Sequence, residues 1–188
     1  MTDTKLVILD RDGVINRDSD AYVKSVEEFV LIEGSVEAIA ELCRQGFTVA
    51  IATNQSGLAR GYFTEHDLSA MHAKMLKAVE QAGGRVSTIA FCPHGPDDNC
   101  RCRKPLAGLI TSIEETLSLS AKGSVMVGDS LRDLQAGIVK GCHPVLVKTG
   151  KGLKTLEKLQ QQSEPGLENV AVFDNLSQAA THIIQHYG

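Results

Sequence analysis

Two aspartates lie two residues apart near the start of this 188-residue chain, directly after an apolar run. Asp10 and Asp12 follow residues 6–9, and Gly13 comes next. Side chains at the carboxyl end of a buried parallel strand project into the crevice where ligands bind. One carboxylate there can attack an electrophile while the other moves protons. Because an Asp-x-Asp pair alone is commonly part of a turn, its interpretation depends on the residues that accompany it.

Polar residues also follow two later apolar runs, in residues 53–56 and at Asp129, with Asp133 four residues beyond. Because the carboxyl ends of parallel strands meet at one edge of a sheet, we expect these residues to lie near Asp10. Aspartates from separate strands repel one another unless a divalent cation lies among them, and carboxylate oxygens suit Mg²⁺. Arg103 and Lys104 would add the fixed positive charge that stabilises a transferred phosphoryl group.

Three of the five cysteines lie within eleven residues and beside a histidine. Cys92, His94, Cys100 and Cys102 have the spacing C-x-H-x5-C-x-C, which predicts a tetrahedral zinc site within a loop at residues 92–104. The residues between His94 and Cys100 are too polar for a core, which argues against scattered core cysteines. With all four positions supplied by protein, the zinc would be structural. Cys43 and Cys142 lie in apolar segments and are predicted to be core residues.

The composition is that of a soluble globular protein. The chain has 43% hydrophobic and 22% charged residues, a net charge of −4 and a pI near 5.9. The length of 188 residues suits one domain over residues 1–188, which we expect to be monomeric. We expect a cytoplasmic protein, because the sequence shows no leader and no apolar stretch long enough to span a membrane. The acidic balance, the low aromatic content and the lack of Trp argue against a zinc-dependent nucleic-acid module. Neither a nucleic acid nor a membrane is expected as a partner.

Apolar runs alternate with amphipathic segments along the chain. This alternation predicts an α/β fold, a doubly wound parallel sheet with right-handed crossovers. The expected strands cover residues 6–9, 47–52, 86–91, 124–127, 145–147 and 170–173, and the expected helices cover residues 35–45, 65–83, 106–119, 130–140, 153–162 and 176–186. Thr64 is the predicted N-cap of the second helix, whose apolar stripe, Leu76 included, is predicted to be core. Residues 16–29 are too few for a separate cap domain but long enough for a loop over the site.

These motifs together resemble those of the haloacid dehalogenase superfamily, phosphatase branch. The resemblance rests on Asp10-Arg11-Asp12-Gly13-Val14, Thr53, Lys104 and the run from Gly128 to Asp133, in that order. It implies that Asp10 is the nucleophile and that Asp12 protonates the leaving group and later activates water. It further implies that Mg²⁺ is bound by Asp10, Asp129 and the main-chain carbonyl of Asp12, with Asp133 in support. Thr53 and Lys104 would hold the phosphoryl group.

Within the superfamily, the zinc loop resembles that of two groups, the heptose bisphosphate phosphatases and the histidinol phosphatases. The stretch from Thr53 to Gly61 resembles the former, which implies removal of the 7-phosphate of a heptose 1,7-bisphosphate in nucleotide-activated heptose and lipopolysaccharide core synthesis. Arg60 would then be available to a second phosphate. The resemblance implies substrate contacts from a set of polar residues: Asp18, Ser19, Asp20, Tyr22, Thr53, Asn54, Gln55, Ser56, Arg103 and Lys104.

Two alternatives remain open at this stage. A histidinol-phosphate phosphatase shares the short form of the zinc loop, and Ser130 stands where some heptose enzymes have a lysine. A non-enzymatic receiver-like domain, the second alternative, also combines aspartates, a Thr and a Lys on a doubly wound sheet. Its acidic pair and its phosphorylated aspartate lie on different strands, however, whereas Asp10 and Asp12 share one turn.

Overall fold

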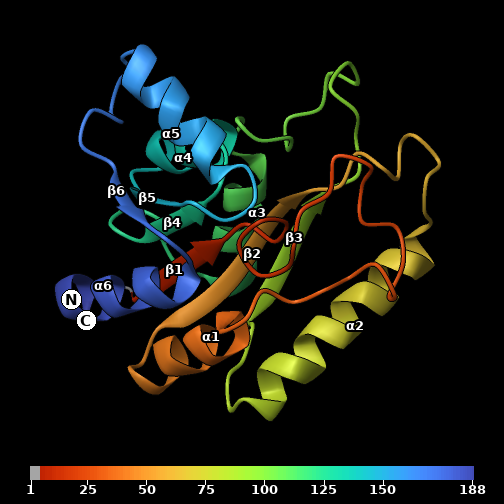
Figure 1. Cartoon of the computed structure of the whole chain (residues 1–188), viewed down its shortest axis with the longest axis horizontal. Coiled ribbons are helices and arrows are strands. Elements are labelled where there is room, and N and C mark those ends of the chain that lie inside the picture. Colours follow the sequence, from red (N-terminus) through yellow and green to blue (C-terminus); the bar gives the residue numbers. More distant parts are fainter. Residues whose placement is uncertain (1–4) are drawn as a thin grey trace.

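The computed structural model describes residues 5–188 and contains a six-stranded sheet in which every neighbouring pair is parallel. The strands are β1 (Leu6–Leu9), β2 (Thr48–Asn54), β3 (Thr88–Cys92), β4 (Val125–Gly128), β5 (His143–Val147) and β6 (Ala171–Phe173). Their order across the sheet is β3-β2-β1-β4-β5-β6 (Figure 1). The predicted doubly wound parallel sheet is confirmed.

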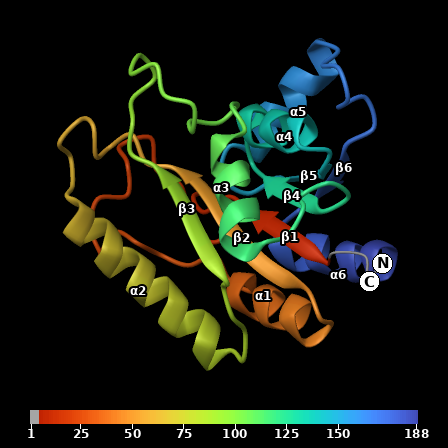
Figure 2. The ribbon, with the colours of Figure 1, turned by 180° about the vertical axis from the view of Figure 1, so that it is seen from behind.

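Helices cover both faces of this sheet (Figures 1 and 2). The helices are α1 (Ser35–Arg44), α2 (Glu65–Gln81), α3 (Gly108–Leu117), α4 (Leu131–Val139), α5 (Gly152–Gln161) and α6 (Leu176–Tyr187). Val7 and Leu9 of β1 pack in the core beneath α1, α2 and α6, whereas Leu6 and Ile8 pack toward α3 and α4. The alternation follows from the two-residue period of a strand, and it explains why the run Leu6–Leu9 is apolar throughout and fully buried.

The helix ends mostly follow the predicted signals. Thr64 is the N-cap of α2, as predicted, and it forms a capping box with Asp67. Two core predictions are wrong: Leu76, at the edge of the apolar stripe of α2, is 37% exposed, and Cys43 is only half-buried. Both residues lie on helices at positions that border the solvent-facing side.

No helix within residues 5–188 is long and apolar enough to cross a bilayer.

The strand order reverses its direction of growth between β1 and β4. From β1 the chain adds β2 and β3 on one side and then returns to add β4, β5 and β6 on the other. The loops that follow β1 and β4 therefore leave the sheet in opposite directions and open a crevice at its carboxyl edge. Residues 10–13 and 129–133 lie at this point of the fold.

Candidate active site

A cavity of about 280 Å³ lies at the crevice. Its lining comes from the segments that follow β1 to β5 and is mainly charged or polar. The lining residues predicted from the sequence are Asp10, Asp12, Asp18, Ser19, Asp20, Tyr22, Asn54, Gln55, Ser56, Arg60, Arg103, Lys104, Asp129 and Asp133, and Ser130 lies among them. The structure therefore brings together, at one edge of the sheet, residues that are up to 123 positions apart in the sequence, from Asp10 to Asp133.

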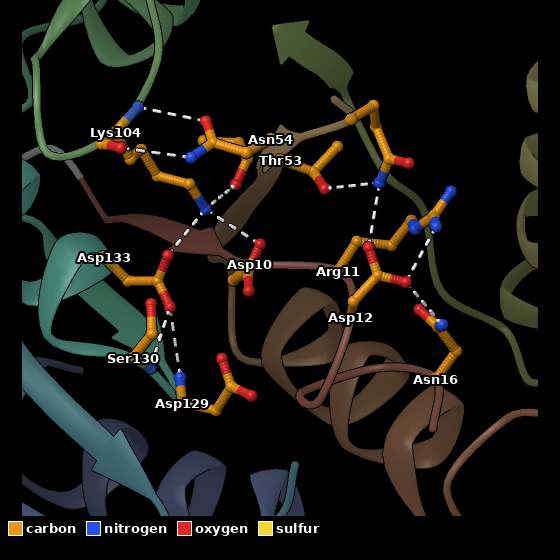
Figure 3. Close-up of polar contacts among 12 residues, drawn as sticks. Asp10, Arg11, Asp12, Asn16, Thr53, Asn54, Lys104, Asp129, Ser130 and Asp133 are labelled. Atoms are coloured by element: carbon orange, nitrogen blue, oxygen red, sulfur yellow. Dashed lines mark hydrogen bonds and ion pairs between the residues drawn. The ribbon is translucent and has the colours of Figure 1, made fainter. Parts of the chain in front are cut away.

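Lys104 is the central cation of the site and is buried. Its ammonium donates to Oδ1 of Asp10 at 2.8 Å, to Oδ1 of Asp133 at 2.7 Å and to the carbonyl of Ala52 at 2.6 Å (Figure 3). These three acceptors match its three N–H donors. Burial alone would lower the pKa of Lys104, but Asp10 and Asp133 raise it above its usual value, so the side chain stays charged.

The main chain of Lys104 is fixed by Asn54 at the end of β2. The Asn54 side chain accepts from the Lys104 amide at 3.0 Å and donates to the Lys104 carbonyl at 3.1 Å. Both ends of the amide are thereby engaged, which makes Asn54 a support for Lys104. Thr53 lies beside it, fully buried, and its hydroxyl accepts from Gln55 at 2.9 Å. Thr53 is the one predicted substrate contact that does not line the cavity.

Three carboxylates crowd together around the same point. Asp10, Asp129 and Asp133 have oxygens that all lie within 4.8 Å of one another, and all three residues are buried. Burial and the neighbouring aspartates raise the pKa of Asp10 to about 7, although Lys104 opposes the shift, and they raise that of Asp129 to about 9. The positive charge of a divalent cation would offset both the burial of these carboxylates and their mutual repulsion. The oxygen donors therefore fit Mg²⁺, which commonly uses one or two carboxylates together with water.

Both carboxylate oxygens of Asp133 already have partners within the protein. Its Oδ1 binds Lys104, and its Oδ2 accepts from the main-chain amides of Asp129 and Ser130 at 3.2 and 3.1 Å. Asp129 has Oδ2 bound by the amide of Lys151 at 2.8 Å, which leaves Oδ1 for a cation. Asp133 thus supports the loop that carries Asp129, as the superfamily resemblance implies.

Asp12 is held by a separate set of donors (Figure 3). Its Oδ1 accepts from Arg11 at 2.7 Å and from Asn16 at 2.9 Å, and its Oδ2 accepts from Gln55 at 2.8 Å. Burial would raise the pKa of Asp12, but Arg11 and these hydrogen bonds outweigh it and hold the pKa below its usual value. The Asp12 carboxylate is not part of the Asp10–Asp129–Asp133 cluster. Two aspartates on one turn therefore have opposite electrostatic environments.

The predicted zinc ligands also meet. Sγ of Cys92 lies 3.6 Å from Nδ1 of His94, 3.8 Å from Sγ of Cys100 and 3.1 Å from Sγ of Cys102, and Nδ1 of His94 lies 3.4 Å from Sγ of Cys102. Zn–S bonds of about 2.3 Å in a tetrahedron place sulfurs about 3.8 Å apart, which is the Cys92–Cys100 separation, while Cys92 and Cys102 lie closer. The four donor atoms all lie within 4.8 Å of one another and could hold one metal ion. The next residue, Arg103, lines the cavity.

Comparison with known proteins identifies the family. A family model described as HAD-hydrolase-like matches residues 101–179. The chain is 53% identical over 180 residues to D-glycero-β-D-manno-heptose-1,7-bisphosphate 7-phosphatase of Pseudomonas putida, covering 96% of this chain and 99% of the relative. It is 52% identical to the enzyme of that name from Neisseria meningitidis, covering 96% of this chain and 95% of the relative. The chain belongs to the heptose-1,7-bisphosphate 7-phosphatase family.

A solved structure of this family has nearly the same backbone. The D,D-heptose 1,7-bisphosphate phosphatase of Bordetella bronchiseptica, crystallised with magnesium and phosphate, superposes with a TM-score of 0.89 at 51% identity, covering 96% of this chain and 98% of that one. Heptose-1,7-bisphosphate 7-phosphatases are phosphoric monoester hydrolases, and membership of the family places this chain in that class. The receiver-like alternative is therefore wrong.

Several cavity residues of this heptose phosphatase family member carry no local sequence signal. Arg132 and Lys151 line the cavity, and Lys151 also forms an ion pair with Asp18 at 3.4 Å. Val23 and Phe63 add apolar surface. Arg11 lies between the two motif aspartates, a position that could have drawn attention to it, but its partners could not be inferred from spacing.

Proposed function

We propose that this protein is a Mg²⁺-dependent phosphatase that removes the 7-phosphate of D-glycero-β-D-manno-heptose 1,7-bisphosphate through an aspartyl-phosphate. The observation that carries the proposal is Asp10, held by Lys104 beside Asp129, in a chain that aligns end to end with phosphatases of that name. The product would serve nucleotide-activated heptose and lipopolysaccharide core synthesis. We further propose that residues 1–188 act as one monomeric, cytoplasmic domain, which light scattering of the purified protein can test for oligomeric state.

In the first half-reaction Asp10 attacks phosphorus in line with the sugar oxygen. Lys104 binds Oδ1 of Asp10, so Oδ2 is the atom that forms the new bond. The ester P–O bond breaks, the phosphoryl group becomes an acyl phosphate on Asp10, and the departing sugar oxygen takes a proton from Asp12. The Lys104 ammonium offsets the negative charge that spreads over the phosphoryl oxygens, with Thr53 as the predicted second ligand of that group.

In the second half-reaction Asp12 works as a base. It takes a proton from water, the water oxygen attacks phosphorus, and inorganic phosphate leaves as the Asp10 carboxylate is restored. Arg11 favours the ionised form of Asp12 in the free protein. The negative charge of a bound phosphate ester raises the pKa of a neighbouring carboxyl, so Asp12 would gain its first proton as substrate binds.

Asp10, Asp129 and the main-chain carbonyl of Asp12 are the proposed magnesium ligands. The bound ion would supply positive charge to the phosphate oxygens and to the crowded carboxylates. Cys92, His94, Cys100 and Cys102 are the proposed ligands of a structural zinc ion. The thiol and imidazole donors and their spacing support zinc over magnesium at that site.

The remaining cavity residues are proposed to select the substrate. Arg60 would bind the phosphate that is not cleaved, and it is positioned over the ring of Tyr22 at 5.9 Å, whereas Arg103 would add positive charge beside Lys104. Burial and the nearby Arg132 lower the pKa of Arg103, so a bound anion would relieve repulsion between the two arginines. Asp18, Ser19, Asp20 and Tyr22, with Gln55 and Ser56, would contact the sugar hydroxyls.

The deciding experiment compares substrates on the purified protein. Phosphate release from heptose 1,7-bisphosphate and from histidinol phosphate is measured, and ³¹P NMR identifies which phosphate of the bisphosphate is lost. We expect loss of the 7-phosphate and little turnover of histidinol phosphate. Arg60→Met should raise KM for the bisphosphate but not for a monophosphate, whereas Arg85→Met, an exposed change outside the cavity, should alter neither. Preferential turnover of histidinol phosphate would overturn the proposal.

A further inference from the structure

A buried arginine connects the proposed acid/base to a helix on the outside of the fold. Arg11 is 1% exposed, and its Nη2 donates to Oδ1 of Asp12 at 2.7 Å. On its other side, Nη1 lies 3.2 Å from Nε2 of His72, which belongs to α2 and is 61 residues away in sequence. The ring of Phe29 lies under the guanidinium, 5.3 Å from its carbon. Arg11 is thus confined by three side chains.

This contact fixes the state of His72. A guanidinium group donates hydrogen bonds and accepts none, so Nε2 of His72 must be the acceptor and the ring proton must lie on Nδ1. Burial and the charge of Arg11, opposed by Asp12, lower the pKa of His72 to about 4, which keeps the ring neutral near pH 7. The ring of Phe91 packs beside it, 6.5 Å between centroids. His72 is therefore a neutral acceptor in a largely apolar position.

The buried guanidinium of Arg11 has few acceptors around it, and its Nε has no hydrogen-bond partner among the described residues. Asp12 and His72 supply the side-chain acceptors of the guanidinium. Without the His72 bond, rotation of the guanidinium would no longer be opposed on the side of α2. Nη2 would then lose its fixed direction toward Oδ1 of Asp12.

We propose that His72 is a positioning residue for proton transfer by Asp12, acting through Arg11. The inference rests on the proposed function, because it assumes that Asp12 protonates the leaving group. His72 orients the guanidinium, and the guanidinium holds Oδ1 together with Asn16, while Gln55 binds Oδ2 from the other side. The carboxylate is thereby held in one rotamer, which is the requirement for efficient proton transfer to a bound ester.

The test separates proton transfer from the rest of catalysis. An alkyl phosphate needs protonation of its leaving oxygen, whereas p-nitrophenyl phosphate has a leaving group that needs little. His72→Leu removes the acceptor, and we expect kcat/KM for the alkyl phosphate to fall about tenfold with kcat/KM for p-nitrophenyl phosphate changed by less than about twofold. His72→Gln retains an acceptor and should recover most of the loss. His66→Leu, the same change at an exposed position of α2, should have no effect on either substrate.

Equal losses on both substrates, or no loss on either, would overturn the proposal. A second measurement on the unaltered protein keeps the test decisive if His72→Leu does not fold. The ¹⁵N shifts of His72 should show a protonated Nδ1 and an unprotonated Nε2, and the reverse tautomer would refute the acceptor role. Failure of the proposed function is seen separately, as a lack of heptose 1,7-bisphosphate turnover by the unaltered protein.

Discussion

Gly13 and Gly150 enclose the Asp129 carboxylate so closely that neither position has room for a Cβ. A Cβ on Gly13 would lie 2.6 Å from Cγ of Asp129 and 3.1 Å from Cα of Gly150, and Gly13 also has φ +85. For Gly13→Ala, the left-handed backbone should cost about 1–2 kcal/mol and the overlap a further ~1–3 kcal/mol. The displaced Asp129 should also weaken Mg²⁺ binding. Urea unfolding with and without Mg²⁺ measures both effects.

Gly46 provides the matched control. Its φ of +84 is almost the same as that of Gly13, but no described atom lies within 4 Å of the position that its Cβ would occupy. Gly46→Ala should therefore lose only the backbone cost, about 1–2 kcal/mol, and keep full Mg²⁺ affinity. The reasoning is refuted if the two variants are equally destabilised and Gly13→Ala still binds Mg²⁺ normally.

Four further outcomes test the site. Asp10→Asn should abolish turnover and leave the fold and zinc content intact, so measurable steady-state phosphate release would contradict nucleophilic attack by Asp10. Asp12→Asn should slow hydrolysis of an alkyl phosphate by about 10²- to 10⁴-fold, and an unchanged rate would mean that another group is the acid. Cys100→Ser should lower zinc content, thermal stability and substrate affinity together, and one equivalent of zinc in this variant would exclude the proposed zinc site. Chelation of Mg²⁺ should instead remove activity reversibly without unfolding the protein. The raised pKa values of Asp10 and Asp129 imply that these carboxyls hold protons near neutral pH, and Mg²⁺ must displace these protons when it binds. Mg²⁺ affinity should therefore rise from about pH 6 to about pH 9, and calorimetry in several buffers should detect the released protons.

The parts of the site that sequence reasoning found are those fixed by topology. Asp10, Lys104 and Asp129 each follow an apolar run or a spaced motif, and parallel strands bring such positions to one edge whatever the details of packing. Short spacings likewise limit where the side chains of the four predicted zinc ligands can reach, and the structure brings these side chains together. Leu76 and Cys43 were misjudged because they border the buried stripe of a helix, where periodicity alone does not set burial.

The parts that were missed depend on contacts between distant segments. Asn54 lines the cavity, but its two hydrogen bonds to the Lys104 main chain, which the loop after β3 makes possible, have no signal in the sequence. His72 follows Met71 in an amphipathic helix, and nothing local distinguishes it from an ordinary surface histidine. Its contact with Arg11 depends on how α2 packs over the segment that follows β1. Pairings of this kind are set by tertiary structure and have no period or spacing in the sequence.

The central position of β1 has a consequence for synthesis of the chain. Val7 pairs with Val49 on one side and with Val125 on the other, so one edge of β1 gains its partner soon and the other only after two-thirds of the chain has emerged. During elongation, an apolar strand with an open hydrogen-bonding edge must wait for β4. Asp10 and Asp129 are brought together by that same late pairing. The nascent protein therefore brings its proposed magnesium ligands, Asp10 and Asp129, together in the step that closes the open edge of β1.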